Sequence, residues 1–144
     1  MTSTILRSTV AAIAFAGAMA FAVPSMAASM TFKASLDGKS EVPPNDSKGT
    51  GTVTATYDTD SKKLTWKGSY KDLSGAATAA HFHGPAAAGK NAGVLVPIAP
   101  ATSPLEGSAT LTDDQAKALM AGDVYVNVHT AANKGGEIRG QLTK

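Results

Sequence analysis

Hydrophobic and polar residues alternate along much of this chain, which is the pattern of β-strands that bury one face. The alternation is clearest in residues 30–36, 51–57 and 64–70, and the polar segment Asp58-Thr59-Asp60-Ser61 separates the last two. A short polar segment between two alternating segments is typical of a β-hairpin. The sequence therefore predicts an antiparallel sheet that begins with these three strands.

Weaker strand patterns follow along the rest of the chain. They are short segments bounded by Gly, Pro or Asn, at residues 76–83, 94–98, 107–111, 123–130 and 137–142. Pro97 lies inside one of them, and because proline has no backbone N–H, this segment is expected at the edge of a sheet.

One segment has the signals of a helix. Thr112 can act as the N-cap, Gln115 stands three residues later as in a capping box, and Gly122 can end the helix. A single short helix among about seven or eight strands predicts an all-β fold, either a Greek-key β-sandwich or a flattened barrel. The core is expected to consist mainly of Phe32, Leu64, Trp66, Phe82, Ile138 and the valines.

The N-terminal residues 1–27 have the features of a signal peptide. Arg7 precedes an apolar run over residues 10–23, and Ser25-Met26-Ala27 supplies the small residues of a cleavage site without a basic stop-transfer flank. We expect cleavage after Ala27, which leaves one exported domain, residues 28–144, with no membrane span after processing. The expected location is the periplasm or the extracellular space.

Composition excludes several classes of function. The chain has no cysteine, so disulfides, cysteine zinc sites and thiol nucleophiles are ruled out. Its formal net charge is +2, and +1 once Arg7 is removed with the predicted signal peptide. A nucleic-acid-binding protein usually carries a much larger positive charge. Neither a phosphate-binding Walker loop nor a Gly-x-Ser-x-Gly motif is present.

All three histidines lie in two short strand-like segments. His81 and His83 are two residues apart, so their side chains share one face of a strand, as do Tyr125, Asn127 and His129. If the two strands are neighbours, facing Cβ atoms lie about 4.5–5.5 Å apart and three imidazoles can meet at one metal ion. Rings on different sheets, more than about 10 Å apart, would exclude a shared site, since metal–imidazole bonds are about 2 Å long.

The chemistry of imidazole limits which metals this site can bind. Three histidines suit copper or zinc, whereas magnesium and calcium prefer oxygen ligands. Copper would allow redox chemistry, while zinc hydrolysis would need a general base that the sequence does not show. The alternative is that the histidines only fix two loops by hydrogen bonds. Tyr125 and Asn127 would either orient the ligands or simply pack.

Arg139 is the candidate for a residue that attracts a substrate. It follows Gly135-Gly136, which would permit close backbone approach to the His129 loop, and its fixed positive charge near a metal could draw in a small anion. The alternative is an exposed ion pair on an edge strand, with Glu137 or Asp123 as the partner.

Four motifs resemble the CHRD domain family, which is named after chordin and also occurs as exported bacterial single-domain proteins. They are Leu36-Asp37-Gly38 with Glu41-Val42-Pro43-Pro44, Ala80-His81-Phe82-His83-Gly84-Pro85-Ala86, the segment of residues 122–130, and Gly135-Gly136-Glu137-Ile138-Arg139-Gly140-Gln141-Leu142. The resemblance covers nearly all of the chain after residue 27.

A second, weaker similarity is to the copper/zinc superoxide dismutases, which have a Greek-key β-sandwich. It implies that His81, His83 and His129 are copper ligands and that Arg139 guides superoxide. The chain has no bridging histidine, no histidine-rich zinc loop and no disulfide, so the similarity implies one copper ion without zinc. The expected function is a copper-only superoxide dismutase. The alternative is a non-catalytic module that stores copper or binds a protein or matrix partner.

Overall fold

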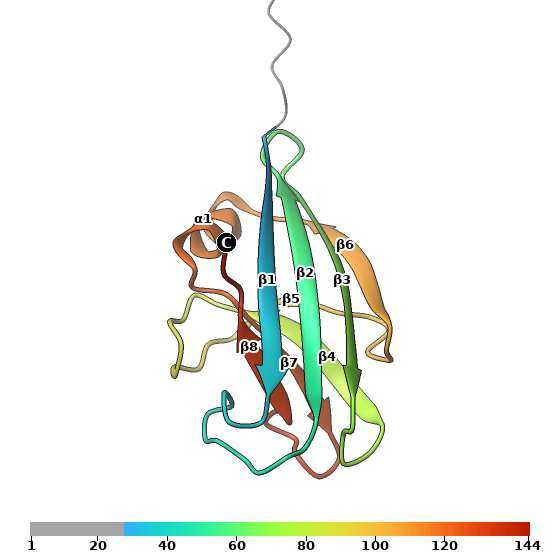
Figure 1. Ribbon diagram of the computed structural model, residues 1–144. Coiled ribbons are helices and arrows are strands. Elements are labelled where there is room, and N and C mark those ends of the chain that lie inside the picture. The colour runs from blue at the N-terminus through green and yellow to red at the C-terminus, as the bar shows by residue number, and fades with distance from the viewer. Residues whose placement is uncertain (1–27) are drawn as a thin grey trace, which may run out of the picture.

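The computed structural model describes residues 28–144, so the predicted signal peptide, residues 1–27, lies outside the described residues and stays a prediction. The described chain consists of eight strands and one helix (Figure 1). In order they are β1 (Ser29–Asp37), β2 (Thr50–Asp58), β3 (Lys63–Lys71), β4 (Ala77–His83), β5 (Val94–Pro97), β6 (Leu105–Thr110), α1 (Asp113–Ala121), β7 (Tyr125–Thr130) and β8 (Ile138–Gln141).

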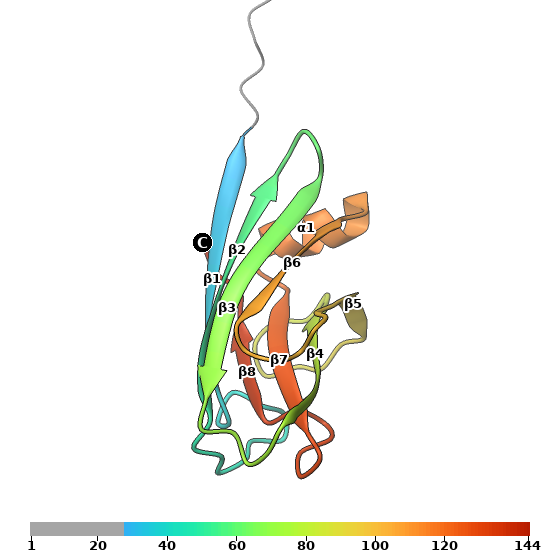
Figure 2. The same cartoon turned by 90° about the vertical axis from the view of Figure 1, so that its right-hand side faces the viewer.

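The strands form one antiparallel sheet in the order β5-β4-β7-β8-β1-β2-β3-β6. The sheet curls so that β1, β2 and β3 form one wall while β4, β7 and β8 form the opposite wall (Figures 1 and 2). This nearly closed barrel confirms the predicted all-β fold with one short helix. Strand β5, which contains Pro97, lies at one end of the sheet, as its missing N–H predicts.

The hairpin of β2 and β3 forms where the alternating pattern predicts it. Its register pairs Tyr57 with Leu64 and Ala55 with Trp66, so the buried residues of both strands face the same side. The turn is held by Asp58, whose carboxylate accepts hydrogen bonds from the backbone N–H groups of Asp60 and Ser61. Such local side-chain acceptors stabilise turns.

The core lies between the two walls and is formed by the predicted residues. Phe32, Leu64, Phe82 and Ile138 are all at most 2 % exposed. The rings of Trp66 and Phe82 meet edge to face at 5.1 Å between centroids, which joins β3 to β4 across the barrel.

Most of the described valines follow the prediction, whereas Val42 is only partly buried and Val94 is exposed. Val124, Val126 and Val128 are buried on the inner side near or in β7, but Val94 is 54 % exposed. The prediction is wrong at Val94, the first residue of the short edge strand β5. Regular alternation would place Val94 on the same side as the buried Val96, but the pairing of β4 with β5 shifts its register between Phe82 and His83.

Helix α1 begins and ends as its sequence predicts. The Thr112 hydroxyl accepts a hydrogen bond from the Gln115 N–H, and the Gln115 side chain accepts one from the Thr112 N–H, which completes the capping box. Gly122 ends the helix in the left-handed conformation with φ 81°. Leu119 packs into the barrel core. Within residues 28–144, no helix is long and apolar enough to cross a membrane.

Three loops meet at one end of the barrel around the carboxylate of Glu137, which is 0 % exposed. It accepts hydrogen bonds from Ser47 Oγ at 2.6 Å, from Ser74 N and Oγ at 2.7 and 2.6 Å, and from Thr130 Oγ1 at 2.6 Å. Burial alone would raise the pKa of Glu137, but these donors outweigh burial and lower the pKa to about 2. The group is therefore an anion that its surroundings satisfy fully.

Replacing Glu137 with Gln removes this anion while keeping its shape. Because hydrogen bonds to charged groups contribute roughly 1.5–3 kcal/mol, we expect the free energy of unfolding at neutral pH to fall by about 2–3 kcal/mol. Urea denaturation measures this change. The matched control is Glu106→Gln on β6, where the side chain is exposed and a change below about 0.5 kcal/mol is expected. Equal losses in the two variants would contradict the role of Glu137.

Acid should reveal the same interaction in the wild-type protein. A carboxyl whose pKa is lower in the folded state stabilises the fold above its ordinary pKa, and the contribution disappears as the pH falls through the folded-state value. For Glu137 the window runs from the ordinary value of 4.5 down to about 2. We expect the stability of Glu137→Gln to depend less steeply on pH in this window than that of the wild type, as measured by urea denaturation at each pH.

Candidate metal centre

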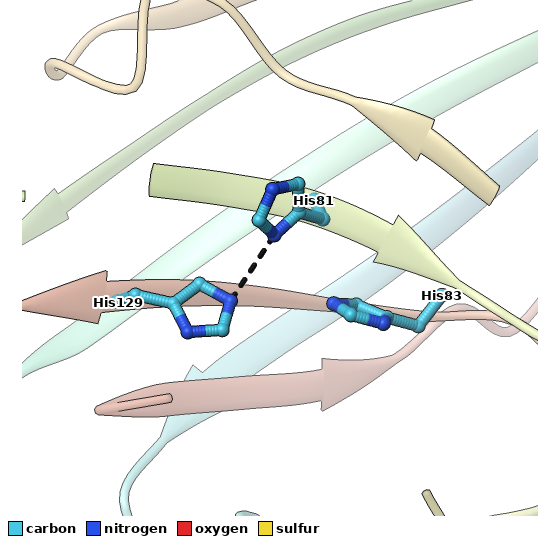
Figure 3. A group of neighbouring side chains, drawn as sticks. All are labelled: His81, His83 and His129. Atoms are coloured by element: carbon cyan, nitrogen blue, oxygen red, sulfur yellow. Dashed lines mark hydrogen bonds between the residues drawn. The ribbon is translucent and has the colours of Figure 1, made fainter. Parts of the chain in front are cut away.

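The two histidine segments are neighbouring strands. In the register of β4 and β7, His81 faces Asn127, His83 faces Tyr125, and His129 faces Ala79. The three histidines lie on the outer face of this wall, since Phe82 and Val128, which alternate with them, are buried in the core. Figure 3 shows the three rings turned toward one another.

The distances between the rings fit a shared ion. Ring centroids are 5.0 Å apart for His81 and His129, 5.4 Å for His81 and His83, and 6.2 Å for His83 and His129. One nitrogen of each ring lies within 4.8 Å of the other two, and His81 Nδ1 is 3.1 Å from His129 Nε2. A tetrahedral zinc site with bonds of about 2.1 Å separates its ligand nitrogens by about 3.4 Å. The nitrogens of the three rings are already near this spacing, and rotation of the imidazoles would adjust the rest.

Backbone carbonyls select the nitrogen that two of the rings can offer to a metal. His83 Nδ1 lies 3.0 Å from Ala92 O, and His129 Nδ1 lies 2.9 Å from Lys134 O. A carbonyl only accepts, so each Nδ1 carries the proton and each Nε2 keeps its lone pair. His83 Nε2 is buried and has no hydrogen-bond partner within the described chain. This arrangement fits a metal, since ligating histidines usually donate their other N–H in this way.

Burial favours the neutral form of two of these imidazoles. It lowers the pKa of His81, where the neighbouring His129 and His83 add to the effect. Burial also lowers the pKa of His83, although the Ala92 carbonyl and the Asn127 side chain oppose the shift. Neutral imidazole is the form that binds metals, so both residues are ready to coordinate at neutral pH.

Arg139 does not lie beside the three histidines. Its guanidinium carbon is 3.4 Å from the centroid of the Tyr125 ring, which stacks on His83 at 4.8 Å with an interplanar angle of 4°. Since β4 and β8 lie on opposite sides of β7, Tyr125 separates the arginine from His83. The role of Arg139 as a guide for superoxide stays a prediction. The arginine makes no direct contact with the histidines in the described chain, so its charge would act on a bound ion at a distance, across the Tyr125 ring.

The alternative of an exposed ion pair for Arg139 is wrong. Strand β8 lies inside the sheet, between β7 and β1, and Arg139 is only 1 % exposed. Its guanidinium donates to Asn91 Oδ1 at 2.9 Å and to Lys90 O at 2.5 Å. The arginine therefore holds the loop that connects β4 to β5 and contains Ala92.

Sequence reasoning missed Glu41, which is 4 % exposed and lies near Asn127 and Arg139. Burial raises the pKa of Glu41 to about 7, although Arg139 and Asn127 pull it down. Two sequence features could have drawn attention to Glu41. Pro43-Pro44 stiffen its loop, and Gly135-Gly136 permit another group to approach the backbone closely. A Cβ at Gly136, whose φ is 132°, would overlap Glu41 Oε1 and Asn127 Nδ2. This glycine therefore leaves room for the acid.

A family model described as the CHRD domain matches residues 32–142. The chain belongs to the CHRD domain family. Comparison with curated proteins and with solved structures gave no significant match. The matched part of this CHRD domain contains the three histidines, Arg139 and Glu41, while the similarity to superoxide dismutases stays a hypothesis.

Arg139→Lys tests whether the planar guanidinium holds this side of the CHRD domain together. Lysine keeps the charge but loses the flat contact with Tyr125 and the paired bonds to the 90–91 segment, so we expect the free energy of unfolding to fall by about 2–3 kcal/mol. The matched control is Lys67→Arg at an exposed site on β3. Urea denaturation compares them, and an unchanged midpoint in Arg139→Lys would contradict this role.

Proposed function

We propose that this CHRD domain is exported, binds one copper ion through His81, His83 and His129, and uses it to dismute superoxide. The observation that supports copper binding most directly is the convergence of three imidazoles, two of which are oriented by backbone carbonyls. The features of a signal peptide in residues 1–27 support a location in the periplasm or outside the cell.

The donor set favours copper over other metals. Among the described residues, the group that could hold an ion consists of imidazoles alone, with no carboxylate or thiolate. Nitrogen ligands bind Cu²⁺ more tightly than other divalent first-row metals, and magnesium and calcium would lack oxygen ligands. Zinc also accepts three histidines and is therefore the main competitor.

The arrangement also suits a small substrate. His81 and His129 are partly exposed while His83 is buried, so one side of the cluster faces solvent. Bound copper would supply one-electron exchange, and two superoxide anions with two protons would give one dioxygen and one hydrogen peroxide. The chain's own part is to keep the imidazoles neutral and oriented. The charge of Arg139, behind Tyr125, adds a positive contribution to the local potential.

The experiment measures copper and activity in the same samples. Purified wild-type protein is expected to bind one copper ion and to remove superoxide. His129→Ala should lower the copper affinity by about 100-fold or more. Replacing even a residue that only supports a ligand lowers metal affinity roughly 10–100-fold. Thr54→Ala, an exposed change on β2, serves as the control for handling and folding.

Each outcome has a distinct meaning. Copper binding without superoxide removal would contradict the enzymatic activity and leave a copper-holding module. No copper binding by the wild type would contradict the metal site itself, and the histidines would then serve only to fix loops.

A further inference from the structure

We propose that Glu41 is a positioning residue of the metal centre that acts on His83 through Asn127. The loop between β1 and β2, residues 38–49, would thereby set how tightly the histidines hold copper and which oxidation state they favour. Because this role presupposes copper binding, it rests on the proposed function.

Asn127 connects the acid to the histidine. It is 2 % exposed and lies on β7, where the register places it between His81 of β4 and Arg139 of β8. Its side chain is close enough to influence the pKa values of both His83 and Glu41, against the larger effect of burial. No protein group within the described residues satisfies Asn127 Oδ1, Glu41 Oε1 or His83 Nε2.

Arg139 and Tyr125 form a second connection between Glu41 and His83. Glu41 is attracted by the charge of Arg139, Arg139 lies over the Tyr125 ring, and Tyr125 stacks on His83. Five side chains, each at most 8 % exposed, thus lie close together on the outer face of the wall. They are Glu41, His83, Tyr125, Asn127 and Arg139.

The loop that carries Glu41 is fixed at its far end. Asn45 Nδ2 donates to Glu137 O at 3.0 Å and to Gly136 O at 3.4 Å, and the Asn45 N–H donates to Gly38 O at 3.0 Å. The loop therefore docks on the segment before β8, and Gly136 leaves room for the carboxyl beside Asn127. A fixed acid at this position is a means of tuning a ligand, because supporting residues orient ligands and set their basicity.

The charge of Glu41 has a predictable effect on a bound cation. Its carboxylate offsets the positive charge of Arg139, which is buried on the same side of the wall. Without it, the arginine would repel a cation held by the histidines, and the repulsion is stronger for Cu²⁺ than for Cu⁺. Loss of the negative charge should thus weaken copper binding and raise the Cu²⁺/Cu⁺ reduction potential.

Glu41→Gln removes the charge and keeps the volume, and Glu106→Gln is the matched control at an exposed site. Copper affinity is measured by competition with a chelator at about pH 8.5, above the raised pKa of about 7 of Glu41, so that the carboxylate is ionised in the wild type. The same samples give the reduction potential. We expect Glu41→Gln to bind copper about tenfold more weakly and at a higher potential, with Glu106→Gln like the wild type.

Glu41→Asp distinguishes charge from loop structure. It keeps the carboxylate, so its potential should lie nearer to the wild-type value than that of Glu41→Gln. Equal affinity and potential in the wild type and Glu41→Gln would overturn the role of Glu41 while leaving copper binding intact. Failure of the wild type to bind copper would overturn both.

Discussion

A buried carboxylate whose charge is satisfied entirely by short hydrogen bonds holds one end of this barrel together. Glu137 receives donors from the loop after β1, from the loop after β3 and from the last residue of β7. Removing a charge from water is costly, and only a complete set of donors offsets that cost. The loops must therefore adopt one arrangement. That arrangement places Glu41, the acid of the β1–β2 loop, near Asn127, and it places the carbonyl of Lys134 against His129.

The wall formed by β4, β7 and β8 has two different faces. Its inner face carries Phe82, Val126 and Ile138, which fill the core, and its outer face carries the histidines and the stacked Tyr125 and Arg139. Antiparallel sheets commonly have one core face and one face free for other contacts. Here loops from both ends cover part of the outer face, so polar groups that alternation would expose become buried. The candidate centre is thus built on strands, whose register fixes ring positions more firmly than loops do.

Local sequence patterns predict the strands, the capped helix and the shared face of His81 and His83, because each depends on alternation or on spacing of a few residues. The meeting of these two with His129 was predicted only on the condition that β4 and β7 are neighbours, and the structure meets that condition. The environment of Arg139 and the roles of Glu137 and Glu41 depend on partners far away in the sequence. Ser47 and Glu137, for example, are 90 residues apart. Alternation also does not predict the order of the strands in the sheet. Arg139 is buried, and not exposed at an edge, because β8 lies between β7 and β1.

The first described strand pairs with the last segments of the chain. Asp37 lies opposite Arg139, and Lys33 exchanges two backbone hydrogen bonds with Thr143. A chain that emerges from its N-terminus can form the β1–β2–β3 meander early, but it cannot close the barrel until the final residues are available. Contacts between distant segments are slow to form. Closure of the barrel is thereby tied to completion of the polypeptide, so a truncated chain would lack the finished barrel on which the histidine cluster lies.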